Sequence, residues 1–237
     1  PACATRSTIS AARSATPAYL PLAPGPQHHL VRSGTGNAQG TQLVRARAIV
    51  NASGAWVNQV LERVGITPRQ RLRFVQGSHL VLPRLYEGEH AYLLQSPDRR
   101  VVFAIPYERR YTLVGTTDLP FEGDPARVSI TAGERDYLLE CLGRFLRRPV
   151  KPADVLWTYS GVRALYDDGS EARAQSVSRD YHLELQCGPG GAPVLSVYGG
   201  KITTYRRLAE AAMQALREPL RGGWGEDWTA SVALHGG

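Results

Sequence analysis

Leu195-Ser-Val-Tyr-Gly-Gly-Lys-Ile-Thr-Thr-Tyr-Arg206 is the stretch that decides the fold. Its apolar run ends at Gly199-Gly200 and a helical pattern begins near Thr203, so it predicts a strand followed by a helix. Two glycines let the backbone pass close to another body, and the first amides of a helix have no partner within it. Lys201, one of two lysines among 28 Lys+Arg, adds a cation beside them. The stretch therefore predicts a site for an anionic group, with an ordinary turn and a solvent-exposed lysine as the alternative.

Composition limits the classes of protein that the chain can represent. A chain of 237 residues with 43% hydrophobic residues can bury a substantial core. Its net charge of +7 suits an anionic substrate or acidic lipid, but no basic-aromatic repeat indicates nucleic acid. Three scattered cysteines without C-x-x-C predict neither a disulfide framework nor a metal site. No apolar run reaches the roughly 18 residues of a membrane-spanning helix.

The order of elements predicts two kinds of module. Residues 1–40 are expected to be irregular, because prolines and glycines interrupt them heavily. A strand over 44–50 and a helix over 57–64 form a βα unit, and another surrounds Lys201, with strands at 181–186 and 194–198 and a helix at 204–216. Between them, strands are expected at 72–82, 91–95, 101–106, 111–117 and 155–162. This order favours a substrate module inserted into, or following, a nucleotide-binding α/β core.

One helix of the central module has a clear start. Thr131-Ala-Gly-Glu134 is a capping box. The helix that it opens should bury one face, formed by Tyr137, Leu138, Cys141, Leu142, Phe145 and Leu146.

Several polar segments suit catalysis or binding. His79 interrupts an apolar strand pattern and could accept a proton from a substrate hydroxyl, or be an ordinary hydrogen-bonded residue of the strand. Arg163 and Arg179 offer planar forks of donors for carboxylate or phosphate, although an aspartate such as Asp180 could pair with either. With Lys201 they would form a pocket of three cations, but spacing does not decide whether they converge. The segment from Gly115 to Asp118 could bind a ligand or, as we expect, cap a turn.

Six segments in a fixed order resemble one family. They are Asn51-Ala-Ser-Gly-Ala-Trp56, Gly77-Ser-His-Leu-Val-Leu-Pro-Arg84, Val114-Gly-Thr-Thr-Asp118, Trp157-Thr-Tyr-Ser-Gly-Val-Arg163, Ser178-Arg-Asp-Tyr181 and Gly199-Gly-Lys-Ile-Thr-Thr-Tyr-Arg206. Together they are similar to the FAD-dependent glycerol-3-phosphate dehydrogenases, respiratory enzymes of the D-amino-acid-oxidase-like flavoprotein superfamily. The resemblance covers about residues 44–236. The sequence does not contain that family's N-terminal G-x-G-x-x-G loop or its C-terminal helical cap. The resemblance therefore implies an internal fragment that is inactive alone.

The resemblance implies a mixed α+β and α/β fold, part of an FAD-binding βα domain plus an antiparallel-sheet substrate domain with packed helices. The expected divisions are 1–43 unassigned, 44–69 FAD-binding, 70–165 substrate domain, 166–217 FAD-binding again, and 218–237 a tail leading to the absent cap.

The resemblance also implies a reaction: FAD-dependent oxidation of sn-glycerol 3-phosphate to dihydroxyacetone phosphate, with electrons passed to quinone. His79 and Arg163 match catalytic positions, and Arg163, Arg179 and Lys201 match substrate-binding positions. The matching cofactor-binding residues are Ala52, Ser53, Gly54, Gly199, Gly200, Lys201, Ile202 and Thr203.

Partners and localisation follow from the same resemblance. It implies a cytoplasmic protein held peripherally at the inner membrane, and it leaves a homodimer open. Two other functions stay open: an amino-acid or hydroxy-acid oxidase of the same superfamily, since carboxylates also bind arginine pairs, and a non-catalytic anion-binding module.

Overall fold

The computed structural model describes residues 31–33, 42–44, 46–167, 180–188, 191–221 and 225–233. The chain forms two compact units. The first, here called the split unit, comprises Pro1–Leu72, Leu165–Gly169 and Ser178–Gly237. The second, the inserted unit, comprises Arg73–Ala164 and Ser170–Val177. Two long strands, β4 (Arg71–Pro83) and β9 (Trp157–Asp167), each begin in one unit and end in the other.

The split unit is built on a three-stranded sheet in the order β10–β11–β3. Its strands are β10 (Tyr181–Cys187), β11 (Pro193–Gly199) and β3 (Ile49–Asn51). The central strand β11 runs antiparallel to β10 and parallel to β3. Helix α1 (Val57–Arg63) follows the short 3₁₀ turn η1 (Gly54–Trp56), and α3 (Tyr205–Arg217) follows η4 (Ile202–Thr204).

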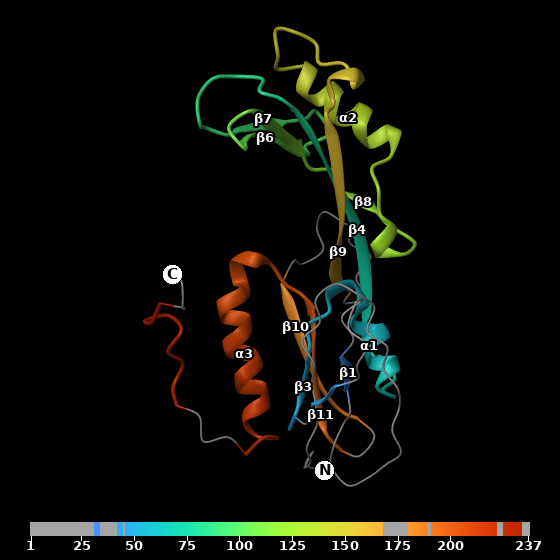
Figure 1. Cartoon of the computed structure of the whole chain (residues 1–237), viewed down its shortest axis with the longest axis vertical. Coiled ribbons are helices and arrows are strands. Elements are labelled where there is room, and N and C mark those ends of the chain that lie inside the picture. Colours follow the sequence, from blue (N-terminus) through green and yellow to red (C-terminus); the bar gives the residue numbers. More distant parts are fainter. Residues whose placement is uncertain are drawn as a thin grey trace. The chain divides into compact units, whose positions relative to one another are not determined.

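Helices cover both faces of this sheet (Figure 1). Val194 and Tyr198 of β11 pack with Val57 and Leu61 of α1. Leu195, one residue out of phase, packs on the other face with α3. A strand buried on both faces needs a continuous apolar run, which explains the pattern at 194–198.

The inserted unit contains a six-stranded sheet. Strands β5 (Tyr92–Gln95), β6 (Val101–Tyr107), β7 (Tyr111–Gly115), β4 and β8 (Leu119–Pro120) follow in that spatial order, and β9 pairs with β4. Neighbours along this order are antiparallel. Helix α2 (Ala132–Gly143) covers one face, and two 3₁₀ turns flank it, η2 (Pro125–Arg127) and η3 (Pro152–Asp154).

Alternation along the strands decides which side chains meet α2. Leu80 and Leu82 of β4 and Val102 and Ala104 of β6 point to the helix, because residues two apart share a face. Leu138 and Leu142 of α2 complete this core.

The predicted fold class, a mixed fold with an antiparallel sheet, is confirmed. The predicted capping box is also confirmed, since Thr131 and Glu134 exchange both of its hydrogen bonds.

Other expectations were wrong. Within residues 1–40, expected to be irregular, β1 (Val31–Ser33) pairs antiparallel with β2 (Gln42–Val44). The strand expected at 44–50 is divided between β2 and β3. Phe145 lies beyond the end of α2 and is 52% exposed, because the helix stops before it could join the buried face. Cys187 is disulfide-bonded, which spacing did not predict because bridged cysteines need not be near in sequence.

Candidate active site

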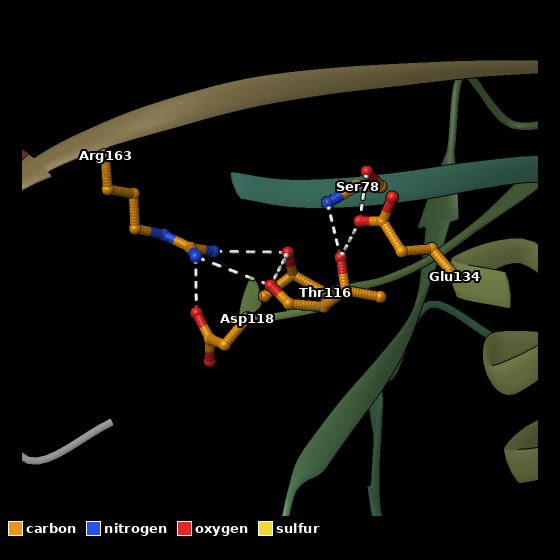
Figure 2. A network of polar contacts seen from close by, with 6 residues as sticks. Ser78, Thr116, Asp118, Glu134 and Arg163 are labelled. Atoms are coloured by element: carbon orange, nitrogen blue, oxygen red, sulfur yellow. Dashed lines mark hydrogen bonds and ion pairs between the residues drawn. The ribbon is translucent and has the colours of Figure 1, made fainter. Parts of the chain in front are cut away.

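The guanidinium of Arg163 is held by the segment Thr116–Asp118, which connects β7 to β8 (Figure 2). Its Nη1 donates to Asp118 Oδ1 at 2.5 Å, and its Nη2 donates to Thr116 Oγ1 at 3.1 Å. Nη1 also reaches the carbonyl oxygen of Thr117 at 3.4 Å. The side chain remains 29% exposed. Since a guanidinium has five N–H donors, these contacts leave donors for an anionic ligand.

His79 lies on the same sheet, half-buried on β4. Its ring stacks on that of Tyr159 from β9, with centroids 5.0 Å apart and planes inclined by 13°. Burial lowers the pKa of His79, and the positive charge of Arg163 lowers that pKa further. The imidazole is therefore neutral at physiological pH, the state in which it can accept a proton.

Two glycines leave the space that these side chains occupy. A Cβ at Gly77 would stand 2.6 Å from Nη2 of Arg163. A Cβ at Gly115, which pairs with His79 across the sheet, would stand 2.7 Å from Cγ of that histidine. Both distances are well under the roughly 3.5 Å of ordinary carbon contacts. Glycine at these two positions is thus explained by the close approach of side chains.

The predicted cofactor-binding residues lie at one edge of the split-unit sheet. Because β3 and β11 are parallel neighbours, the segments that follow both strands leave the sheet at the same edge. Ala52–Gly54 follow β3, while Gly199–Thr203 end β11 and begin η4. Gly199 and Gly200 have φ values of +72° and +98°, which L residues with a side chain rarely adopt. Lys201, Ile202 and Thr203 are exposed, and Ile202 is 85% exposed.

Asn51 anchors the first of these segments. Its buried side chain donates to the carbonyl oxygen of Val57 at 2.9 Å and to Ser196 Oγ of β11 at 3.4 Å. Its Oδ1 accepts a 2.6 Å hydrogen bond from Ser53 Oγ. One amide thus joins the turn after β3 to the start of α1 and to the neighbouring strand.

The structure gathers the predicted site residues in two groups. His79 and Arg163 lie together in the inserted unit. The eight predicted cofactor residues lie in the split unit: Ala52, Ser53, Gly54, Gly199, Gly200, Lys201, Ile202 and Thr203. Arg179 lies outside the described residues.

Sequence reasoning missed three residues of these groups. Asp118 was expected to cap a turn, yet it is the acidic partner of Arg163. Tyr159 and Asn51 lie within two of the motifs that resemble the family, but no role was predicted for either. Their position beside the predicted residues in those motifs was the available signal.

The sequence is similar to a known protein family and to individual enzymes. The family model described as FAD dependent oxidoreductase matches residues 25–206. A glycerol-3-phosphate dehydrogenase of Pseudomonas aeruginosa is 47% identical over 195 residues, which are 82% of this chain and 38% of the relative. A D-erythritol 1-phosphate dehydrogenase of Brucella abortus is 44% identical over 200 residues, 83% of this chain and 39% of the relative. The chain thus spans less than half the length of these relatives.

A solved structure with a similar fold is also a glycerol-3-phosphate dehydrogenase. The glycerol-3-phosphate dehydrogenase from Bacillus halodurans, complexed with FAD, superposes with a TM-score of 0.62 at 28% identity. The match covers 78% of this chain and 34% of that one. The resemblance drawn from the order of motifs is therefore confirmed.

The residues at the edge of the split-unit sheet fit FAD. The amides that begin η4 have no partner within that helical turn, and Lys201 beside them is exposed. The exposed apolar side chain of Ile202 suits contact with an aromatic ring system. Donors, a cation and an apolar contact in one place match the mixed character of a flavin. By its motifs, its fold and the family model that it matches, the chain belongs to the FAD dependent oxidoreductase family.

Proposed function

We propose that the protein containing this chain oxidises the C2 hydroxyl of sn-glycerol 3-phosphate to dihydroxyacetone phosphate. The identity of 47% to the Pseudomonas aeruginosa glycerol-3-phosphate dehydrogenase supports this substrate. So does the 42% identity to the aerobic enzyme of Escherichia coli. FAD, when bound, supplies an acceptor for the hydride that leaves C2 of the substrate.

One observation carries the proposal: the half-buried imidazole of His79 and the ordered guanidinium of Arg163 lie on one sheet, and the charge of Arg163 helps to lower the pKa of His79. Oxidation of an alcohol requires loss of the hydroxyl proton, and a ring nitrogen of His79 is the acceptor that we assign. Arg163 binds the substrate phosphate through its free N–H donors, since a guanidinium fork matches phosphate geometry. Binding the phosphate orients the hydroxyl for proton transfer to His79.

The split unit contributes the cofactor-binding residues. Ala52, Ser53 and Gly54 approach the cofactor from β3, while Gly199–Thr203 approach it from β11. Lys201 and the amides at the start of η4 favour added negative charge at this edge. Arg179 remains a proposed phosphate ligand by its place in the Ser178–Tyr181 motif.

Phosphorylated polyols longer than glycerol form a second candidate substrate class. The Brucella abortus relative named for D-erythritol 1-phosphate is 44% identical. An arginine that binds the phosphate end does not select the length of the polyol, so His79 and Arg163 serve either substrate.

The proposal includes the partners that the resemblance to the family implies. Electrons pass to quinone, and the protein associates peripherally with the cytoplasmic face of the inner membrane, as a monomer or a homodimer. Among the described residues, every helix is too short or too polar to cross a membrane. The net charge of +7 suits attraction to anionic lipid headgroups.

A substrate panel tests the proposal. The full-length protein, loaded with FAD, is assayed with an artificial electron acceptor and glycerol 3-phosphate, D-erythritol 1-phosphate, glycerol, glycine or lactate. We expect turnover with a phosphorylated polyol and little with glycerol. Oxidation of glycine or lactate in preference to both phosphates would assign an amino-acid or hydroxy-acid oxidase. Binding of anions without any turnover would indicate a non-catalytic module.

A pair of arginine variants sharpens the test. Arg163→Gln should raise the KM for the phosphorylated substrate, because it removes the charge that binds the phosphate. Arg127→Ala, in the same unit, is the control, since its side chain is 88% exposed and faces only Asp124 at 3.8 Å among the residues described. Equal KM values for both variants would contradict the role of Arg163.

A further inference from the structure

Glu134 is a buried carboxylate that the proposed reaction does not use. It belongs to the first turn of α2 and is 2% exposed. Four residues, Gln76, Ser78, Thr117 and Thr131, donate five hydrogen bonds to its two oxygens. Burial by itself would raise the pKa of Glu134, but hydrogen bonds from Thr117, Thr131 and Ser78 lower that pKa below its ordinary value. The group is therefore a fixed anion at neutral pH.

The two oxygens of Glu134 serve different parts of the unit. Oε2 accepts from the backbone N–H of Thr131 at 2.8 Å, from its Oγ1 at 3.0 Å, and from Gln76 Nε2 at 2.7 Å. This end completes the capping box of α2. Oε1 accepts from Ser78 Oγ at 2.7 Å and from Thr117 Oγ1 at 2.6 Å. A helix cap does not require that second end, so Oε1 needs another explanation.

The Oε1 end leads to Arg163 through a short chain of contacts. Thr117 Oγ1 donates to Glu134 and accepts the backbone N–H of Ser78 at 2.9 Å, so its side chain is held on both sides. The residues before and after Thr117 are the two whose side chains bind the guanidinium, Thr116 and Asp118. Figure 2 shows the carboxylate of Glu134 and the guanidinium of Arg163 on opposite sides of this segment.

We propose that Glu134 is a positioning residue for Arg163. Its carboxylate fixes the segment Thr116–Asp118 between β7 and β8, and that segment places the guanidinium for the substrate phosphate. The inference rests on the proposed function only for the identity of the ligand that Arg163 binds.

Glu134→Gln isolates the Oε1 end. The partners of Oε2 include a backbone N–H and an amide N–H, which can only donate, so the introduced amide oxygen must stay there. Its NH₂ then faces Ser78 and Thr117. The hydroxyl of Thr117 can then only accept from this NH₂ and no longer donates to an anion, so the charged hydrogen bond is lost. The capping box is preserved because glutamine also serves in it. Thr117→Val removes the same contact from the other side, together with the acceptor of the Ser78 N–H, whereas Thr117→Ser keeps the hydroxyl that makes both bonds.

Steady-state kinetics with glycerol 3-phosphate form the first measurement. We expect Glu134→Gln and Thr117→Val each to raise KM about tenfold, the size of one lost hydrogen bond to a charged group, with a smaller change in kcat. Combined with Arg163→Lys, each should act less than additively, because both changes disturb one interaction. Gln76→Met is the matched control, since it removes the bond at Oε2 and those to the carbonyl oxygen of Ser129 and to Ser78 Oγ, but leaves the Oε1 bonds of Glu134 in place. It should reduce stability without raising KM.

A second measurement does not depend on the reaction. Phenylglyoxal modifies guanidinium groups, and mass spectrometry of the peptide containing Arg163 gives the rate in the unliganded, FAD-loaded protein. We expect faster modification in Glu134→Gln and Thr117→Val than in the wild type, Thr117→Ser and Gln76→Met. Should the wild type fail to oxidise glycerol 3-phosphate, the proposed function falls and this rate still decides the role of Glu134. Loss of stability with an unchanged modification rate, or full additivity with Arg163→Lys, would overturn the inference.

Discussion

Replacing Gly115 by alanine tests whether the position of the His79 ring matters for the reaction. The added Cβ would stand 2.7 Å from Cγ and 2.9 Å from Nε2 of His79. Ordinary carbon contacts are about 3.5–4.0 Å, so the ring has to move by about 1 Å. The parallel stack on Tyr159 limits where it can go.

We expect the Gly115→Ala variant to lose kcat by roughly a hundredfold, because a misplacement of about 1 Å at a reacting group has a cost of that size. Overpacking should also lower the free energy of unfolding by about 1–3 kcal/mol. The assay is steady-state oxidation of glycerol 3-phosphate with an artificial acceptor, at equal FAD content, beside urea denaturation. The added methyl group removes none of the hydrogen bonds of Arg163, so KM should change less than kcat.

Gly143→Ala is the control, because the added Cβ meets no atom within 4 Å and the residue is far from His79 along the chain. It should leave kcat unchanged. A Gly115→Ala variant that folds, holds FAD and keeps the kcat of the wild type would refute the assignment of His79 as the proton acceptor.

Three further predictions follow from the same contacts. Burial and, to a smaller extent, the charge of Arg163 lower the pKa of His79 below 6.5, so the acid limb of the kcat/KM profile should lie below that pH. In Arg163→Gln this limb should move to higher pH, and a pH profile with an unchanged limb would contradict the prediction. Asn51→Ala leaves the carbonyl oxygen of Val57 without its amide donor and should lower the free energy of unfolding by about 1–3 kcal/mol, measured in urea, with weaker retention of FAD. Gly199→Ala forces a side chain into a φ of +72°, with its Cβ 2.7 Å from the carbonyl oxygen of Asp180, and should reduce the FAD retained on gel filtration. Gly161→Ala is the control, since the added Cβ meets no atom within 4 Å, and this variant should retain FAD as the wild type does.

Local pattern predicted the elements well where short-range physics decides them. The capping box at Thr131 needs only residues three apart, so its letters are sufficient evidence. The continuous apolar run of β11 indicates burial on both faces, and the structure places α1 and α3 there. The expected helix was extended too far, to Leu146, because the apolar periodicity continues past Gly143, where α2 ends.

Contacts across strands could not be predicted in this way. Arg163 and Asp118 are 45 residues apart in sequence, and Glu134 and Ser78 are 56 apart. Each pair meets because strand register and the packing of α2 bring them together. Ser78 and His79 point to opposite faces of β4, and a shift of one residue in its register would move each side chain to the other face.

The amino-acid sequence alone determined the family of this protein, since the ordered motifs and the two βα segments can be recognised without coordinates. It also determined the candidates for proton transfer and anion binding, because imidazole and guanidinium chemistry belongs to the residue types themselves. Only the tertiary structure decided that Asp118 pairs with Arg163, that Gly77 and Gly115 make room for neighbouring side chains, and that Thr117 donates to the carboxylate of Glu134. The physical reason is that hydrogen bonds and steric contacts act over a few ångströms in space, and the folded backbone sets which distant residues come within that range.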